Sequence, residues 1–270
     1  MIEDSISNSS QIKEIKFTSK SLGKEMAMLV YVPENYGHID HLHVLYFLHG
    51  RSGDEHILYD ADINTIADSL INSKKIKPMI IVCPRIENSR GINSSLTCGE
   101  VADPFGRIIN IGMYEDYFIN EVIPIVDKSF HTITNRNGRY IGGASAGGYA
   151  ALHYAFRHQN LFSKVGGHMP AVELKLENED KAYFKEDGSW EKYDPISIVK
   201  RHRISPNIDI YLDSGDNDEG EFYNSCSTLY DLLQKGGILS QNHIFKGHHN
   251  VEYIKSNMEK YLMFYDSIID

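Results

Sequence analysis

The sequence predicts an α/β fold, with a mostly parallel central sheet, an antiparallel N-terminal hairpin and helices on both faces. Three observations indicate it. Short uninterrupted apolar runs at 44–48 and 79–82 are typical of strands that are buried on both faces of a parallel sheet. Segments with helical spacing of apolar residues alternate with such runs. Near the start, apolar residues at 26, 28, 30 and 32 recur with a period of two, as in a half-buried strand.

The first expected elements form the hairpin. Residues 12–19 alternate imperfectly between apolar and polar side chains, and Glu25–Val32 alternates regularly until Pro33 ends it. We expect these two segments to pair as antiparallel strands. Residues 1–11 are polar, and we expect them to be frayed.

Two helices are expected before the middle of the chain. Asp62–Asn72 places its apolar residues on one helical face, between the two apolar runs. Tyr114–Asp127 has the same spacing. Pro124 within it predicts a kink or a break late in the helix, because proline cannot donate a backbone hydrogen bond.

Strand and helix patterns then continue to alternate to the end of the chain. Crossover helices of this kind are what parallel strands require. The strands are expected at 139–144, 208–212 and 242–245, and the helices at 146–157, 222–233 and 252–269. We therefore expect a single domain over residues 1–270.

Residues 169–200 interrupt this alternation. They contain Met169-Pro170, a charged run at 173–187 and Trp190, the only tryptophan of the chain. Two interpretations remain open. The segment is either a solvated connection with a short helix, or a lid or substrate-facing loop, since long irregular segments in compact domains often serve function.

Composition excludes several classes of protein. The 270 residues are 41% apolar and 24% charged, which is ordinary for a globular chain with a sizeable core. The net charge of −10 offers no electrostatic footprint for a phosphate backbone, so we expect no nucleic acid partner. No apolar run approaches the roughly 20 residues that a membrane span needs, so we expect no membrane association.

The cysteines and the N-terminus indicate the compartment. Cys83, Cys98 and Cys226 are widely spaced and form no CxxC motif, so neither a disulfide framework nor a cysteine zinc site is indicated. The opening residues lack the basic and apolar regions of a secretory signal. We expect a cytoplasmic protein, with the oligomeric state left open, a homodimer included.

The sharpest local motif lies at 142–148. Gly143-Ala144-Ser145-Ala146-Gly147 is a G-x-S-x-G between a predicted strand and a predicted helix, the context of a nucleophile elbow. A P-loop is excluded because Gly148-Tyr149 stands where Lys-Ser/Thr is required. A purely structural glycine turn is the remaining alternative.

A nucleophilic serine needs a base, and the base needs an acid to orient it. In hydrolases with this arrangement the acid and then the histidine follow the serine, at strand ends. The loop after strand 208–212 offers Asp213, Asp216 and Asp218, and the loop after the last strand offers His248 and His249. The residues themselves leave the choice within each loop open.

A glycine-rich turn, His49–Gly53, directly follows the strand 44–48. Such a turn can direct a backbone N–H at the point reached by the N–H that follows the serine, which makes an oxyanion hole. We expect the backbone N–H groups of Arg51 and Ala146 to form it, and His49 to hold the turn. The histidines at 38, 41 and 43 lack recognisable ligand spacing and are expected at the surface, so no metal is predicted.

The sequence resembles the esterases of the esterase D type, in the α/β-hydrolase superfamily, from about residue 20 to the end. Relatives of that family include feruloyl esterases, enterochelin esterase catalytic domains and mycolyltransferases. The resemblance rests on 21–36, on Tyr46-Phe-Leu-His-Gly50, on 116–127 with its proline and on 141–150. It implies an α/β-hydrolase fold.

The resemblance also implies which acid and which histidine act. The family's acid is the aspartate of G-x-x-D, here Asp218, and its histidine lies in a G-G-H-x-W-like stretch, here His249. Val251 and Ile254 stand where the better-known members have aromatic residues, so this sequence departs from the family in its pocket.

Together these features predict a cofactor-independent serine esterase with Ser145, His249 and Asp218 as catalytic triad and a small-molecule or sugar-linked ester as substrate. An acyltransferase would use the same residues, and a peptidase on this fold is a further alternative. A non-catalytic binding module and a metal-dependent deacetylase are the other interpretations. The identity of the ester is left open.

Overall fold

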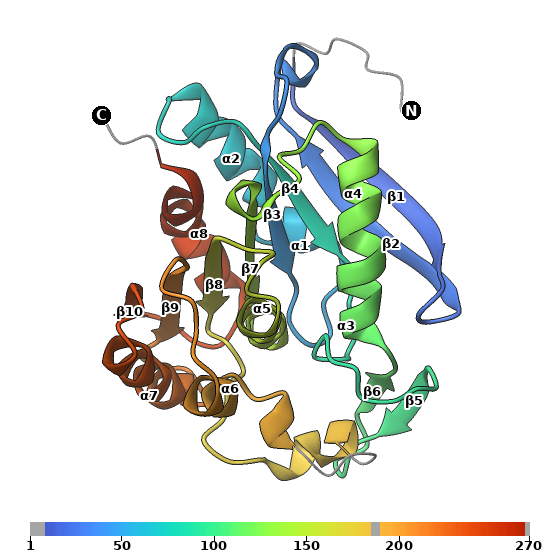
Figure 1. Ribbon diagram of the computed structural model, residues 1–270, viewed down its shortest axis with the longest axis vertical. Coiled ribbons are helices and arrows are strands. Elements are labelled where there is room, and N and C mark those ends of the chain that lie inside the picture. Colours follow the sequence, from blue (N-terminus) through green and yellow to red (C-terminus); the bar gives the residue numbers. More distant parts are fainter. Residues whose placement is uncertain (1–8, 185–189, 268–270) are drawn as a thin grey trace.

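The computed structural model describes residues 9–184 and 190–267, and its centre is an eight-stranded sheet (Figure 1). The strand order is β1-β2-β4-β3-β7-β8-β9-β10. β1 and β2 are antiparallel, β2 is antiparallel to β4, and all later neighbours are parallel. The strands are β1 (Gln11–Ser19), β2 (Lys24–Val32), β3 (His43–Leu48), β4 (Met79–Pro84), β7 (Arg139–Ala144), β8 (Lys164–His168), β9 (Asp209–Gly215) and β10 (Ser240–Phe245). The predicted fold class is confirmed.

Helices cover both faces of this sheet. One apolar cluster packs helices α1, α2 and α8 against one face, and the other packs α3 to α7 against the opposite face. The helices are α1 (Ile57–Asp60), α2 (Ile63–Asn72), α3 (Tyr114–Tyr117), α4 (Ile123–Ser129), α5 (Ala146–Arg157), α6 (Pro195–Arg201), α7 (Phe222–Lys235) and α8 (Val251–Asp266). In the described part of the chain, no helix is both long and apolar enough to span a bilayer.

The helix expected at Tyr114–Asp127 is interrupted where the proline predicted it. A π-helical turn, Phe118–Val122, separates α3 from α4, and Pro124 is the second residue of α4. Proline lacks an N–H and its ring crowds the preceding turn, so the backbone widens there without ending the helix.

Two strand pairings escaped the sequence patterns. β8 consists of Lys-Val-Gly-Gly-His and has only one apolar side chain of any size. A small antiparallel hairpin, β5 (Gly99–Ala102) with β6 (Ile108–Ile111), lies outside the main sheet (Figure 1). Of the N-terminal residues expected to fray, 1–8 lie outside the described part of the chain. Gln11 is already the first residue of β1 and pairs with Val32 of β2.

In the described residues 169–184 and 190–200, the segment that interrupts the alternation is more buried than a solvated connection. Ala182, Tyr183 and Phe184 are each less than 10% exposed. The Tyr183 hydroxyl donates a hydrogen bond to the backbone oxygen of Asn88 at 2.6 Å. The short helix expected in this segment is α6.

Candidate active site

Ser145 occupies the sharp turn between β7 and α5. Its backbone has φ 53° and ψ −116°, a positive-φ conformation that costs free energy for a residue with a side chain. The flanking glycines are required by close backbone approach. A Cβ on Gly143 would lie 2.6 Å from the carbonyl carbon of Gly147, and one on Gly147 would lie 2.3 Å from the backbone oxygen of Leu48. The small residues of the motif therefore let strand, helix and β3 meet.

The structure brings Ser145, His249 and Asp218 into one hydrogen-bonded chain. His249 Nε2 lies 2.8 Å from Ser145 Oγ, and His249 Nδ1 lies 2.8 Å from Asp218 Oδ2. Asp218 is 3% exposed, and its other oxygen accepts a hydrogen bond from the N–H of Gly220 at 2.9 Å. Three residues from the loops after β7, β9 and β10 thus meet at the carboxyl edge of the sheet.

Glu219 is a neighbour that the sequence patterns did not single out. Its carboxylate accepts the backbone N–H of His249 at 3.0 Å and contacts His248 Nδ1 at 2.8 Å. The hydrogen bond from the His249 backbone is the main cause that lowers the pKa of Glu219 to about 2. This ionised side chain therefore anchors the loop that carries His249.

The other acid and histidine candidates lie elsewhere. Asp213 is the fifth residue of β9 and is fully buried, because the strand continues beyond its predicted end at Leu212. Asp216 accepts the backbone N–H of Gly247 at 3.0 Å. The side chain of His248 is 61% exposed and faces Glu219.

The sequence predicts that two backbone N–H groups, those of Arg51 and Ala146, form an oxyanion hole beside Ser145. Ala146 is the first residue of α5, so its N–H has no acceptor within the helix. The turn that carries Arg51 lies against the serine, since a Cβ on Gly50 would be 3.2 Å from Ser145 Cβ. His49 holds this turn. Its Nδ1 lies 2.8 Å from the backbone oxygen of Gly50, and its Nε2 accepts the N–H of Ile86 at 2.9 Å.

Ser145 opens into a cavity of about 630 Å³. Phe222 packs against the His249 ring with the ring centres 5.1 Å apart. Val251 and Ile254, the two departures from the family pattern, also line the cavity. Its apolar lining residues are Ile57, Ala144, Ala146, Met169, Ala171, Phe222, Val251 and Ile254.

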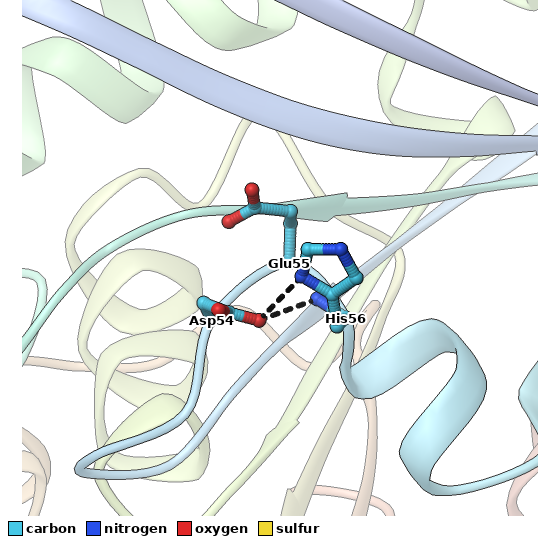
Figure 2. Close-up of side chains that lie close together, drawn as sticks. All are labelled: Asp54, Glu55 and His56. Atoms are coloured by element: carbon cyan, nitrogen blue, oxygen red, sulfur yellow. Dashed lines mark hydrogen bonds and ion pairs between the residues drawn. The ribbon is translucent and has the colours of Figure 1, made fainter.

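Within the described residues, two groups with metal-ligand chemistry adjoin this cavity. In the first, Asp54 Oδ1 accepts a hydrogen bond from the backbone N–H of His56 at 2.8 Å and lies 2.9 Å from His56 Nδ1 (Figure 2). Both Glu55 oxygens accept hydrogen bonds from Arg85, at 2.7 and 2.5 Å. The atoms of this group are therefore engaged with one another and with an arginine.

The second group consists of Glu173, Glu179 and Asp180, and arginines occupy it in the same way. Arg90 contacts Glu173 at 2.9 Å and Asp180 at 3.0 Å. Arg107 contacts Glu179 at 2.6 Å. Guanidinium groups thus already contact all three acidic side chains of this group.

Of the histidines expected at the surface, His43 is partly buried instead. Its ring stacks on Tyr140, and its Nδ1 contacts Asp266 at 2.9 Å. His38 and His41 are exposed, as predicted.

A family model described as "Putative esterase" matches residues 19–265. The chain belongs to this family. The esterase resemblance of the sequence is thereby confirmed over nearly the full length.

Individual relatives are more distant. The chain is 28% identical over 165 residues to an endo-1,4-beta-xylanase/feruloyl esterase of Xylanibacter ruminicola. This match covers 59% of this chain and 21% of that protein. It is 25% identical over 175 residues to the esterase Rv1288 of Mycobacterium tuberculosis, 64% of this chain and 35% of that protein. The chain thus spans about a fifth and a third of the length of these two curated relatives.

Solved structures of other proteins share the fold. A ferulic acid esterase superposes with a TM-score of 0.79 at 22% identity, over 96% of this chain and 99% of that one. An S-formylglutathione hydrolase of Staphylococcus aureus superposes with a TM-score of 0.75 at 19% identity, over 95% of this chain and 98% of that one.

Proposed function

We propose that this protein is a serine hydrolase that cleaves carboxylic esters of small-molecule or sugar-linked acyl substrates. Membership of the esterase family supports ester hydrolysis as the reaction class. The observation that carries the proposal is the unbroken hydrogen-bonded chain from Ser145 Oγ through His249 to Asp218, which ends at the cavity. A strained serine beside such a chain is the arrangement of an activated nucleophile.

In the first half of the reaction, Ser145 Oγ attacks the carbonyl carbon of the ester while His249 Nε2 takes the hydroxyl proton. Asp218 accepts a hydrogen bond from His249 Nδ1–H, which fixes the tautomer with a free Nε2 lone pair. The same carboxylate then stabilises the imidazolium that forms.

The negative charge that develops on the carbonyl oxygen needs donors that are already in position. The N–H groups of Arg51 and Ala146 fill this role, and removal of one such donor in a serine hydrolase costs on the order of 10²–10³ in rate. His249 next delivers its proton to the leaving oxygen, so the alcohol departs and the acyl group stays on Ser145. Water, deprotonated by the same His249, then hydrolyses the acyl-enzyme.

A fluorophosphonate probe tests the proposal directly, because it reacts with an activated serine irrespective of the natural ester. We expect stoichiometric labelling of the wild type, none of Ser145→Ala, and loss of p-nitrophenyl acetate turnover by about 10⁴-fold or more in the variant. Ser214→Ala is the matched control. It changes a buried serine near the end of β9, away from the cavity, and should label as the wild type does.

Three results would contradict the proposal. The first is a folded wild type that the probe does not label. The second is labelling that persists in Ser145→Ala. The third is turnover in that variant comparable to the wild type. Transfer of the acyl group to added alcohols in preference to water would instead favour the acyltransferase alternative.

A further inference from the structure

The side chain of Arg51 leaves the glycine-rich turn and ends on the segment 169–200. Its guanidinium contacts Asp180 Oδ1 at 2.9 Å and Glu179 Oε1 at 3.7 Å. Arg51 is also the residue whose backbone N–H we assign to the oxyanion hole. One residue therefore carries both the proposed donor and an ionic link to a segment 129 positions later in the chain.

Asp180 is built to hold such a link. Its side chain is fully buried, and its carboxylate lies between two guanidinium groups, since Oδ2 contacts Arg90 at 3.0 Å. Burial alone would raise the pKa of Asp180, but Arg90 and hydrogen bonds from Glu173 and Arg51 lower it, so the carboxylate stays ionised. A charge that is buried and paired in this way is held in one position.

Arg90 in turn fixes Asp180 to the body of the protein. It is 2% exposed, and it also contacts Glu173 at 2.9 Å and the backbone oxygen of Ala171 at 3.0 Å. The backbone N–H of Ala171 donates to the backbone oxygen of Ser145 at 2.9 Å. The segment that holds Arg51 is thus itself tied to the serine turn.

We infer that Asp180 is a positioning residue for the oxyanion hole, because its ion pair with the Arg51 side chain fixes the direction of the Arg51 backbone N–H. This inference rests on the proposed function. His49 and a hydrogen bond from the Ser52 N–H to Asn88 Oδ1 at 2.7 Å also hold this turn. The ion pair adds a side-chain link at Arg51, between the flexible glycines at 50 and 53. In this role the segment 169–184 acts on the oxyanion hole indirectly, through the contact between Asp180 and the Arg51 side chain.

The decisive variant is Arg51→Met. It removes the guanidinium, keeps the backbone N–H and much of the side-chain length, and leaves the buried Arg90–Asp180 pair intact. A trifluoromethyl ketone, which forms a tetrahedral adduct with a nucleophilic serine, reports on the oxyanion hole. The corresponding methyl ketone binds without a stable adduct and reports on the pocket alone.

We expect Arg51→Met to weaken inhibition by the trifluoromethyl ketone about tenfold or more, somewhat less than loss of a donor costs. The inhibition constant of the methyl ketone should stay within about twofold. The value of kcat/KM for p-nitrophenyl acetate should fall by about the factor by which the inhibition constant of the trifluoromethyl ketone rises. Arg51→Lys, which keeps a charge for Asp180, should recover part of the loss. Arg201→Met is the matched control, because it removes an ion pair of the same segment that lies away from the turn.

A double-mutant comparison tests the route through Asp180. In an Asp180→Asn background, Arg51→Met should have little further effect on the trifluoromethyl ketone constant, because the link is already broken. An equal effect in both backgrounds would overturn the inference. So would an unchanged trifluoromethyl ketone constant in Arg51→Met, or an equal weakening of both ketones, which would indicate a pocket-shaping role. Failure of the proposed function would appear separately, as a wild type that neither probe nor trifluoromethyl ketone modifies.

Discussion

Two acid–histidine pairs lie at the carboxyl edge of the same sheet, and they differ in what surrounds them. In each pair, histidine Nδ1 lies 2.8 Å from an aspartate oxygen, His249 with Asp218 and His168 with Asp213. The His249 side chain is 21% exposed, whereas His168 and Asp213 are fully buried. Their distances and chemistry are alike, so the pair by itself does not define a catalytic base.

The second nitrogen of each ring makes the difference. Nε2 of His249 meets the Ser145 hydroxyl in an open cavity, whereas Nε2 of His168 meets the Tyr265 hydroxyl at 3.1 Å in the core. Asp213 also accepts hydrogen bonds from Tyr253 and Tyr261, at 2.6 and 2.7 Å. The buried pair thus joins α8 to the sheet, whereas the open pair contacts the serine and the cavity, as the proposed proton transfer requires.

The largest expected difference between the pairs is in rate. His249→Gln should lower kcat/KM for p-nitrophenyl acetate by about 10⁴-fold or more, because no group remains to accept the Ser145 proton. The midpoint of thermal unfolding should change little. If His249→Gln keeps a tenth of the wild-type kcat/KM, the proposed difference in role between the two pairs is wrong.

A smaller loss of rate is expected when the acid of the open pair is changed. Asp218→Asn keeps the shape but favours the wrong tautomer of His249, and we expect kcat to fall by about 10³–10⁴-fold. The matched change in the closed pair, Asp213→Asn, should leave the kcat of the folded fraction within about tenfold, with active sites counted by fluorophosphonate labelling. Equal losses of rate in the two variants would contradict this comparison.

The closed pair should show its importance in stability instead. His168→Leu leaves Asp213 in the core without its imidazole partner, so the free energy of unfolding should fall by about 3–5 kcal/mol. His168→Gln retains a donor and should cost less. Urea denaturation of both variants measures this difference, and an equal loss in the two would show that the hydrogen bond to Asp213 is not what matters.

The smallest expected effect is a pH dependence of stability that arises from the buried carboxyl group of Glu173. Burial, with Asp180 nearby, raises the pKa of Glu173 from 4.5 to about 8, although Arg90 opposes the shift. Between these two values the folded protein keeps a proton that the unfolded chain releases. The free energy of unfolding therefore falls as pH rises through this window.

Glu173→Gln removes this titration and keeps a side chain that can donate to Asp180. The stability of the variant relative to wild type should therefore increase from pH 5 to pH 8, measured by urea denaturation at both values. Parallel pH dependence of the two proteins would show that Glu173 is ionised in the fold at neutral pH.

The sequence named the residues of the open pair, through the family resemblance, but did not indicate the closed pair. The elbow motif gave the bounds of β7 and α5 correctly, because glycines at contact points leave an unmistakable spacing. β8 was missed because its strand signal is replaced by Gly166 and Gly167. A Cβ on Gly166 would lie 2.1 Å from the Tyr265 hydroxyl, so the space of a strand side chain is filled from α8. Such long-range packing has no local pattern.

The link between Arg51 and Asp180 was equally hidden. The charged run at 173–187 has the composition of a solvated segment, yet Asp180 is fully buried because Arg51 and Arg90 reach it from distant parts of the chain. Spacing within the run carries no information about partners more than 80 residues away. The contacts of Asp180 therefore emerge only from the three-dimensional arrangement.

The distance along the chain between the serine and its base has a consequence for biosynthesis. Ser145 and His249 are 104 positions apart, and the histidine comes after every strand of the sheet. At about 5–20 residues per second, a ribosome needs roughly 5–20 s to reach the histidine after the serine. During that interval the emerging polypeptide contains Ser145 but not the histidine that we propose as its base. Under the proposed mechanism, the nascent chain therefore has no activated serine until the whole sheet and the loop beyond β10 have been made.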